Sequence, residues 1–328
     1  MKRIFGGAAL AATLLAGAAW AQQPAPAAPQ PFAAGMPLGV TANGQYTPMA
    51  KNVKVYGGVV STESCSYDAS RGLIVAPGRG VPNNVRTNDA FVSLINHDGS
   101  VHTPLWIGQT RNGLVLNEPL GSDIENGKLY LADRDGGDNG TPVVSVIRMF
   151  DMKTGAPAGE IKTADSTGFN DIEVATDGTI YGTQTGALGN AANPQRVYKI
   201  TPDGKSSVWI EGGPLALPNG IAFDPAGNIV VVNIDTAAVL TFDKAGKLLK
   251  TEQASQPGND GLVIMRDGTK YVSSVRNGGV SKIAPGKPSV LIATGIPSPA
   301  SMCYDAGANQ LVIPMNANNG LAFIKLGK

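Results

Sequence analysis

Four side chains that offer oxygen ligands stand at equivalent positions of a repeated sequence unit. They are Glu63, Asn170, Asn219 and Asp260. Two carboxylates and two amide carbonyls form an all-oxygen set that suits a hard divalent cation, Ca²⁺ first, with Mg²⁺ or Mn²⁺ possible. Zn²⁺ is less favoured because no histidine or cysteine joins the set. The sequence therefore predicts a metal site, provided that the fold gathers these positions. The alternative is that Asn and Asp begin these segments only because they favour turns.

The repeated unit consists of a polar or small residue, an apolar segment, a turn with Gly or Asn, and a second apolar segment. Its copies occupy residues 63–77, 121–133, 169–184, 217–233, 259–274 and 299–314. The clearest copies begin about 40 to 50 residues apart, a period typical of a propeller blade. Two more strand-like segments follow each pair, except in the last copy, whose outer strand we expect residues 53–60 to supply.

Six units of four strands predict an all-β fold, a six-bladed β-propeller with four-stranded blades and a ring closed by an N-terminal strand. Glycine accounts for 42 of 328 residues and falls between Val-, Ile- and Tyr-rich segments, which is typical of an all-β domain. In such a ring the innermost strands line a central channel. Their starts gather at one mouth, and that mouth would hold the four oxygen-bearing side chains.

The first residues indicate export. Lys2 and Arg3 precede an apolar segment at 4–17, and Ala19-Trp20-Ala21 resembles a cleavage signal, so residues 1–21 are interpreted as a signal peptide cut before Gln22. Residues 22–50 form a Pro/Ala-rich leader and residues 51–328 a single propeller domain. We expect a periplasmic or secreted monomer with no membrane anchor. With 26 Lys and Arg against 25 Asp and Glu, no charge excess attracts nucleic acid.

The two cysteines, Cys65 and Cys303, lie on the innermost strands of the first and last units. Cys65 is two residues after Glu63, whereas Cys303 is three residues after the equivalent Ala300, so the two side chains leave their strands on opposite faces. On neighbouring blades they can therefore face each other across the seam or both point away. An exported protein can keep a disulfide. A disulfide and two buried free thiols are both open from the sequence.

Several segments resemble a known family. NGIAFDPAGN, NDIEVATDG and NDGLVIMRDG, with an early Glu before a strand, are similar to the senescence marker protein (regucalcin)/gluconolactonase/luciferin-regenerating-enzyme-like family of six-bladed propellers. The resemblance covers residues 60–326. It implies a metal held by Glu63 from the first blade, Asn170 and Asn219 from the third and fourth, and Asp260 from the fifth. The asparagine that matches Asn170 contacts the metal in some members and mainly substrate or water in others. It also implies that Asp260 is the catalytic base or nucleophile.

Two positions depart from the family pattern. Ser64 and Cys65 follow Glu63 where the family commonly has Gly-Pro, and Gly168 stands where sugar-lactone members often have Arg. Loss of that guanidinium removes an expected clamp for a polyhydroxylated or anionic sugar lactone. The metal prediction is unaffected, and the substrate is left open.

These features predict an exported metal-dependent hydrolase of lactones or related esters, acting on a small-molecule substrate whose carbonyl is polarised by the cation. Asp260 would activate a water molecule or attack directly. One alternative is a non-catalytic propeller that binds a structural Ca²⁺, and another is a phosphotriester hydrolase using the same ring. Weaker candidates for substrate contact are Arg86, Arg111 and Asn112, in polar loops that could equally be ordinary surface loops.

Overall fold

Only strands, turns and loops occur in the part of the chain that the computed structural model describes, residues 46–80, 88–108, 113–137 and 140–327. The predicted signal peptide and residues 22–45 of the leader lie outside these ranges. Within them, no helix is long and apolar enough to span a membrane.

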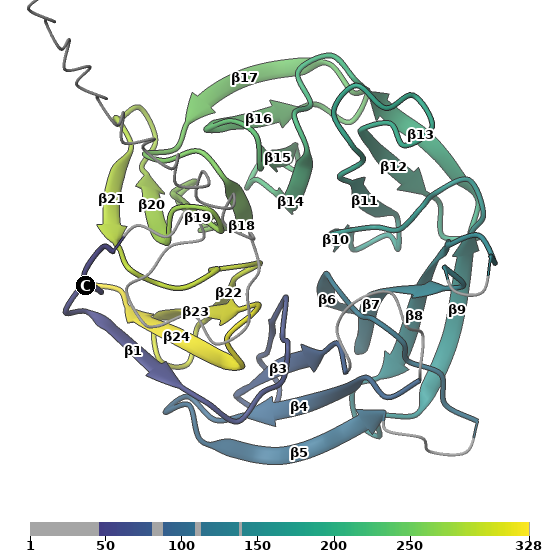
Figure 1. Ribbon diagram of the computed structural model, residues 1–328, viewed down its shortest axis with the longest axis horizontal. Helices are drawn as coiled ribbons and strands as arrows, with labels where there is room; N and C mark the ends of the chain where they lie inside the picture. Colours follow the sequence, from purple (N-terminus) through teal and green to yellow (C-terminus); the bar gives the residue numbers. More distant parts are fainter. Residues whose placement is uncertain (1–45, 81–87, 109–112, 138–139, 328) are drawn as a thin grey trace, which may run out of the picture.

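The strands form six antiparallel sheets of four, arranged as blades around a central channel (Figure 1). Blade 1 contains β2 (Ser66–Asp68), β3 (Leu73–Gly78), β4 (Phe91–Ile95) and β5 (Val101–Gly108). Blade 2 contains β6 (Ser122–Glu125), β7 (Lys128–Asp135), β8 (Val144–Asp151) and β9 (Pro157–Thr163). Blade 3 contains β10 (Ile172–Val174), β11 (Ile180–Gln184), β12 (Arg196–Ile200) and β13 (Ser206–Glu211).

The remaining blades follow the same order. Blade 4 contains β14 (Pro218–Phe223), β15 (Ile229–Asn233), β16 (Ala238–Phe242) and β17 (Leu248–Gln253). Blade 5 contains β18 (Asn259–Ile264), β19 (Lys270–Ser274), β20 (Gly279–Ile283) and β21 (Val290–Ala293). Blade 6 contains β22 (Cys303–Asp305), β23 (Gln310–Met315), β24 (Gly320–Lys325) and β1 (Val53–Tyr56). The predicted six-bladed propeller with four-stranded blades is therefore confirmed.

Turns that contain an Asp and a Gly join the first two strands in several copies of the repeat, as Asp177-Gly178, Asp267-Gly268 and Asp224 with Gly227. In blade 4 the Asp224 carboxylate accepts hydrogen bonds from the backbone N–H groups of Ala226 and Asn228. Gly227 completes this turn with a φ of 76°, a left-handed conformation that glycine adopts without strain. The turn reverses the chain and sets the register of β14 against β15.

The core of the protein lies between the blades. Six clusters of buried apolar side chains occur among the described residues, and each joins two consecutive blades. For example, Val230 and Val232 of β15 belong to the same cluster as Leu262 and Val272 of blade 5. Burial of one such side chain contributes roughly 1.5–3 kcal/mol, so the packing between blades stabilises the ring.

The ring is closed at its outer edge by a strand from the N-terminal side. β1 pairs antiparallel with β24, with Val53 opposite Ile324, so part of the 53–60 segment supplies the outer strand of blade 6 as predicted. Two residues of the predicted leader, Pro48 and Ala50, also contact the ring. Ala50 N–H donates to the Thr294 carbonyl, and the Thr294 hydroxyl donates to the Pro48 carbonyl.

Candidate functional site

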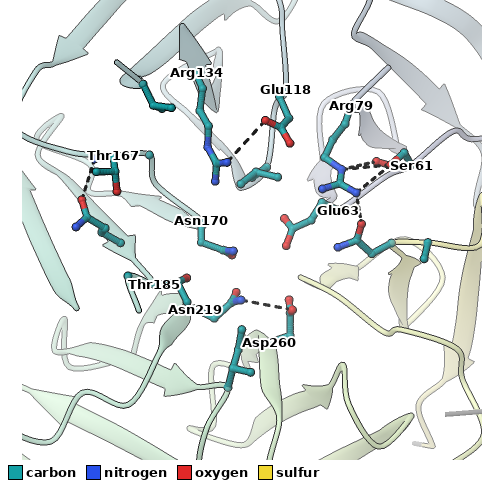
Figure 2. A pocket seen from close by; sticks show the side chains of 18 of the residues that line it. Ser61, Glu63, Arg79, Glu118, Arg134, Thr167, Asn170, Thr185, Asn219 and Asp260 are labelled. Carbon is teal, nitrogen blue, oxygen red and sulfur yellow. Dashed lines mark hydrogen bonds and ion pairs between the residues drawn. The ribbon is translucent and has the colours of Figure 1, made fainter. Parts of the chain in front are cut away.

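The four side chains singled out from the repeat meet in one cavity at the channel. Glu63, Asn170, Asn219 and Asp260 all line a cavity of about 780 Å³, and Figure 2 shows their polar ends converging. Asn219 and Asp260 belong to the innermost strands β14 and β18, whereas Glu63 and Asn170 precede β2 and β10. The residues Glu63, Asn219 and Asp260 are 1–2% exposed. The propeller thus brings together residues almost 200 positions apart.

Glycines behind two of these residues allow the innermost strands to approach one another. A Cβ atom at Gly220 would lie 2.2 Å from the carbonyl oxygen of Asp260, and one at Gly261 would lie 2.5 Å from that of Ala300. Real Cβ atoms do not approach backbone this closely, so a larger residue would push the blades apart. The recurring Asn-Gly and Asp-Gly pairs are explained by this backbone contact as well as by the oxygen-bearing side chain.

Hydroxyl groups on the second strands fix the backbone of the site. The Thr183 hydroxyl donates to the Asn219 carbonyl and accepts a hydrogen bond from Asp171 N–H, joining blades 3 and 4. Ser273 has the equivalent place in blade 5, where its hydroxyl donates to the Ala300 carbonyl and accepts from Gly261 N–H. These two hydroxyls therefore join the channel-lining backbone of blade 3 to that of blade 4, and that of blade 5 to that of blade 6.

The side-chain oxygens of the site are largely left without hydrogen-bond donors. Asn219 Nδ2 donates to Asp260 Oδ2 over 3.4 Å. Among the described residues, no group donates to four other buried oxygens, which are Glu63 Oε2, Asn170 Oδ1, Asn219 Oδ1 and Asp260 Oδ1. Leaving a buried polar atom unsatisfied costs about 1–3 kcal/mol, so this arrangement indicates a partner from outside the chain.

The carboxyl groups here lie close together in a water-poor environment. Burial, and then the charges of Asp260 and Asp171, raise the pKa of Glu63 well above its usual range. Burial and then the charge of Asp171 raise the pKa of Asp260 in the same way. A bound cation would favour the charged forms of both carboxyls, because it supplies the opposite charge that burial removes.

Asp171 is a part of the site that the repeat pattern missed. Its buried carboxylate accepts hydrogen bonds from Ile172 N–H, Ile221 N–H and the Ser301 hydroxyl, which come from blades 3, 4 and 6. Burial raises the pKa of this carboxyl to about 7. One signal was available in the sequence, since Asp171 follows Asn170 where glycines follow Asn219 and Asp260.

Two arginines on the cavity wall were also missed. Arg79 follows β3, and its guanidinium donates to the Ser61 carbonyl, the Ser61 hydroxyl and the Asn316 amide oxygen. Arg134 lies in β7, with its Nη1 3.7 Å from the Glu118 carboxylate. Both arginines line the same cavity as Asp260.

Arg134 occupies space left by Gly168, one of the two departures from the family pattern. A Cβ atom at Gly168 would lie 2.5 Å from Arg134 Nε, so this position admits only glycine while Arg134 is in place. The arginine of the family pattern is absent at position 168, but β7 of the neighbouring blade places the guanidinium of Arg134 beside this glycine. Contacts between blades are not visible in the spacing of a repeat.

The second departure has a structural role. The Ser64 hydroxyl donates to the Leu120 carbonyl at the entry to blade 2. Cys65 forms a disulfide with Cys303 of blade 6, which resolves the alternative that the sequence left open. The residues in place of Gly-Pro thus tie the segment that carries Glu63 to both neighbouring blades.

The donor chemistry of the site fits a hard cation. In the described part of the chain, no three His, Cys, Asp or Glu side chains form a group that could hold a metal ion. A cation here would therefore depend on the two asparagine amides as well as on Glu63 and Asp260, and oxygen-only sets of this kind suit Ca²⁺. Arg86, Arg111 and Asn112, the weaker candidates for substrate contact, lie outside the described residues.

Comparison with known proteins supplies a family match. The model of the SMP-30/Gluconolactonase/LRE-like region matches residues 123–314, more than half of the chain. No curated protein matches the chain at a significant level.

Solved structures share the fold. A gluconolactonase from Xanthomonas campestris superposes with a TM-score of 0.56 at 17% identity, covering 90% of this chain and 97% of that one. A putative gluconolactonase gives 0.54 at 17% identity, covering 84% and 93%. Virginiamycin B lyase from Staphylococcus aureus gives 0.52 at 14% identity, covering 84% and 100%. At these identities the likeness concerns the fold alone.

Proposed function

Because the chain belongs to the SMP-30/gluconolactonase/LRE-like family, we propose that it is a metal-dependent hydrolase of lactones or related esters. The observation that supports this most directly is the set of four buried oxygens, one from each of four blades, that accept no hydrogen bond from the described residues. Glu63, Asn170, Asn219 and Asp260 would hold a divalent cation, with Ca²⁺ preferred for an all-oxygen set.

The cation, when bound, would act as a Lewis acid on the carbonyl oxygen of the substrate. Asp260 is the residue of the set that we assign to proton transfer or nucleophilic attack. As a general base it takes a proton from water while the water oxygen bonds to the acyl carbon. The acyl C–O bond then breaks, and the proton passes to the departing alkoxide oxygen. In direct attack, the Asp260 carboxylate forms an acyl anhydride that water subsequently cleaves.

Metal analysis and a substrate panel test this proposal. Purified protein should contain about one divalent cation per chain. It should hydrolyse simple lactones or aryl esters in a reaction that EDTA abolishes and Ca²⁺ restores. A phosphotriester is included in the substrate panel to test the alternative of a phosphotriester hydrolase. Glu63→Gln and Asp260→Asn should each lose metal and turnover, whereas Asp98→Asn, in the exposed turn between β4 and β5, should lose neither.

Two results would contradict the proposal in different ways. Stoichiometric metal without turnover on any substrate would indicate a binding module with a structural cation. Full hydrolysis and metal content in both site variants would exclude the four-residue site. A single turnover in H₂¹⁸O separates the two roles of Asp260. After direct attack, water that cleaves the anhydride at the Asp260 carbonyl carbon leaves ¹⁸O in the protein, whereas general-base catalysis places ¹⁸O only in the product.

A further inference from the structure

Arg79 and Arg134 place positive charge on the cavity wall. Figure 2 shows the guanidinium groups of both residues on the side of the cavity opposite Asp260. They come from neighbouring blades, and both border the space that a substrate would occupy. Neither residue belongs to the four-oxygen set, although the charges of both oppose the rise in the pKa of Glu63 and the charge of Arg79 opposes that of Asp260.

Uncharged groups hold the guanidinium of Arg79 in place. Its hydrogen-bond acceptors are the carbonyl and hydroxyl oxygens of Ser61 and the amide oxygen of Asn316, at 2.6–3.3 Å, and none of them carries a charge. In the described ranges, no carboxylate forms an ion pair with Arg79. A guanidinium fixed by neutral acceptors keeps its full charge and needs little reorganisation to bind an anion.

Arg134 completes the wall at a defined position. Its Nη1 lies 3.7 Å from Glu118, longer than a charge-assisted hydrogen bond, and its Nε would lie 2.5 Å from any Cβ atom at Gly168. Gly168 also has a φ of 132°, which side-chain-bearing residues rarely adopt. Because residue 168 is a glycine, the guanidinium of Arg134 has room at this position.

The overall charge of the cavity supports an anionic ligand. Its charged lining residues are Glu63, Glu118, Asp260, Arg79 and Arg134. Three carboxylates against two guanidiniums leave one excess negative charge when all are ionised. A divalent cation on Glu63 and Asp260 reverses this to one excess positive charge, which a monoanion balances.

From these observations we propose that the substrate is a carboxylate-bearing lactone or ester. Its carboxylate binds Arg79 and Arg134, while its acyl carbonyl faces Asp260. This inference rests on the proposed hydrolase function and deepens it by naming the substrate class. The hydrogen-bond acceptors of Arg79 are uncharged, so a substrate carboxylate would give this guanidinium a counter-charge that a neutral lactone does not supply. Arg134, which is paired with Glu118, adds a second guanidinium on the same wall.

A pair of lactones that differ only in charge tests the proposal. The carboxylate 5-oxotetrahydrofuran-2-carboxylate and its neutral carboxamide have nearly the same shape. Wild-type protein should show kcat/KM at least tenfold higher for the carboxylate, and this ratio should fall as KCl is raised from 0.05 to 0.5 M. The salt experiment needs no variant. Equal rates for the two lactones, or a ratio that does not respond to salt, would overturn the proposal.

Variants of Arg79 and Arg134 test whether these two residues cause the preference for the carboxylate. Arg79→Met and Arg134→Met should each lower the carboxylate-to-carboxamide ratio by about tenfold, since each removes one charge-assisted contact. Arg134→Lys keeps the charge and should recover part of the ratio. Arg71→Met is the matched control. Arg71 lies in the turn between β2 and β3, whereas Glu63 precedes β2, so the two residues are at opposite ends of this strand. A ratio unchanged in both wall variants would contradict the assignment.

Binding measurements separate this inference from the hydrolase proposal. Tetrahydrofuran-2-carboxylate and its carboxamide lack the scissile bond, so calorimetry reports only the recognition of the charged group. Tighter binding of the carboxylate, without hydrolysis of either lactone or of any substrate in the panel, would support the anion site and contradict the hydrolase. Hydrolysis of both lactones without preferential binding would support the hydrolase and refute the anion site.

Discussion

Asn219 donates a hydrogen bond to Asp260 across the seam between blades 4 and 5, from Nδ2 to Oδ2 over 3.4 Å. This bond uses one polar atom of each side chain. It leaves Asn219 Oδ1 and Asp260 Oδ1 without a hydrogen-bond partner in the described structure. The two residues therefore orient each other and keep one oxygen apiece for a ligand, which makes Asp260 the most informative position to change.

Asp260→Asn should stabilise the metal-free protein at high pH. The pKa of Asp260 is raised in the folded state by burial and then by Asp171. Its contribution to stability is therefore fully present below the unfolded pKa and is lost as the pH rises through the folded pKa. In EDTA the variant should gain about 1–3 kcal/mol at pH 8 and little at pH 4.

The same variant should lose its response to metal. Ca²⁺ at 100 times its Kd stabilises a protein with one site by about 2.7 kcal/mol, seen as a rise in Tm. Thermal unfolding with EDTA or Ca²⁺ measures both effects, and Asp98→Asn serves as the exposed control. A rise in Tm with Ca²⁺ equal to that of the wild type would show that Asp260 is not a ligand.

Thr183→Val should weaken the site through the backbone. The substitution keeps the shape of the side chain but removes the hydroxyl that joins Asp171 N–H to the Asn219 carbonyl. We expect a loss of about 1–3 kcal/mol in the free energy of unfolding and a weaker affinity for Ca²⁺. Urea titration and calorimetry measure these quantities.

The matched control is Thr241→Val in β16, away from the cavity lining. It should lower stability less and leave the Ca²⁺ affinity unchanged. An unaltered affinity in Thr183→Val would mean that the hydroxyl supports the fold but does not position Asn219.

Much of the architecture could be predicted because it depends on local periodicity. The spacing of Asn170, Asn219 and Asp260 predicts the blades and the shared mouth. The roles of Asp171 and Arg134 could not be predicted in this way. Asp171 binds groups from three blades, and Arg134 fills a space that Gly168 leaves in the next blade. Such contacts depend on how neighbouring blades pack, which a single repeat does not encode.

Glu252→Gln should have the opposite pH dependence to Asp260→Asn. Burial raises the pKa of Glu252, but hydrogen bonds and charges from Lys250 and Lys270 outweigh it and lower the pKa. The stabilisation is therefore present above the unfolded pKa and is lost as the pH falls through the folded pKa.

We expect Glu252→Gln to cost up to about 1 kcal/mol at pH 7, because the pair is partly screened by solvent. At pH 3 the variant and the wild type should unfold at nearly the same urea concentration. A loss of equal size at both pH values would indicate a packing effect instead of an ionic one.

Replacing both cysteines should destabilise the ring. The disulfide between Cys65 and Cys303 joins positions separated by 238 residues, and a native disulfide typically contributes about 2–5 kcal/mol. The double variant Cys65→Ala/Cys303→Ala, which leaves no reactive thiol, should unfold at a lower urea concentration. Oxidised and reduced wild-type protein should differ in the same direction. A midpoint unchanged in both comparisons would show that the packing between blades alone closes the ring.

The position of the disulfide also determines how the protein would respond to mechanical force. β1 and β24 are antiparallel neighbours, so tension applied at the two chain ends separates them one residue pair at a time, beginning at Val53 and Ile324. Beyond this point the load passes from Cys65 to Cys303 through the covalent bond. Residues 66–302, which contain the whole of blades 1 to 5, carry no tension. Blade 6 is the part of the propeller that pulling would extend.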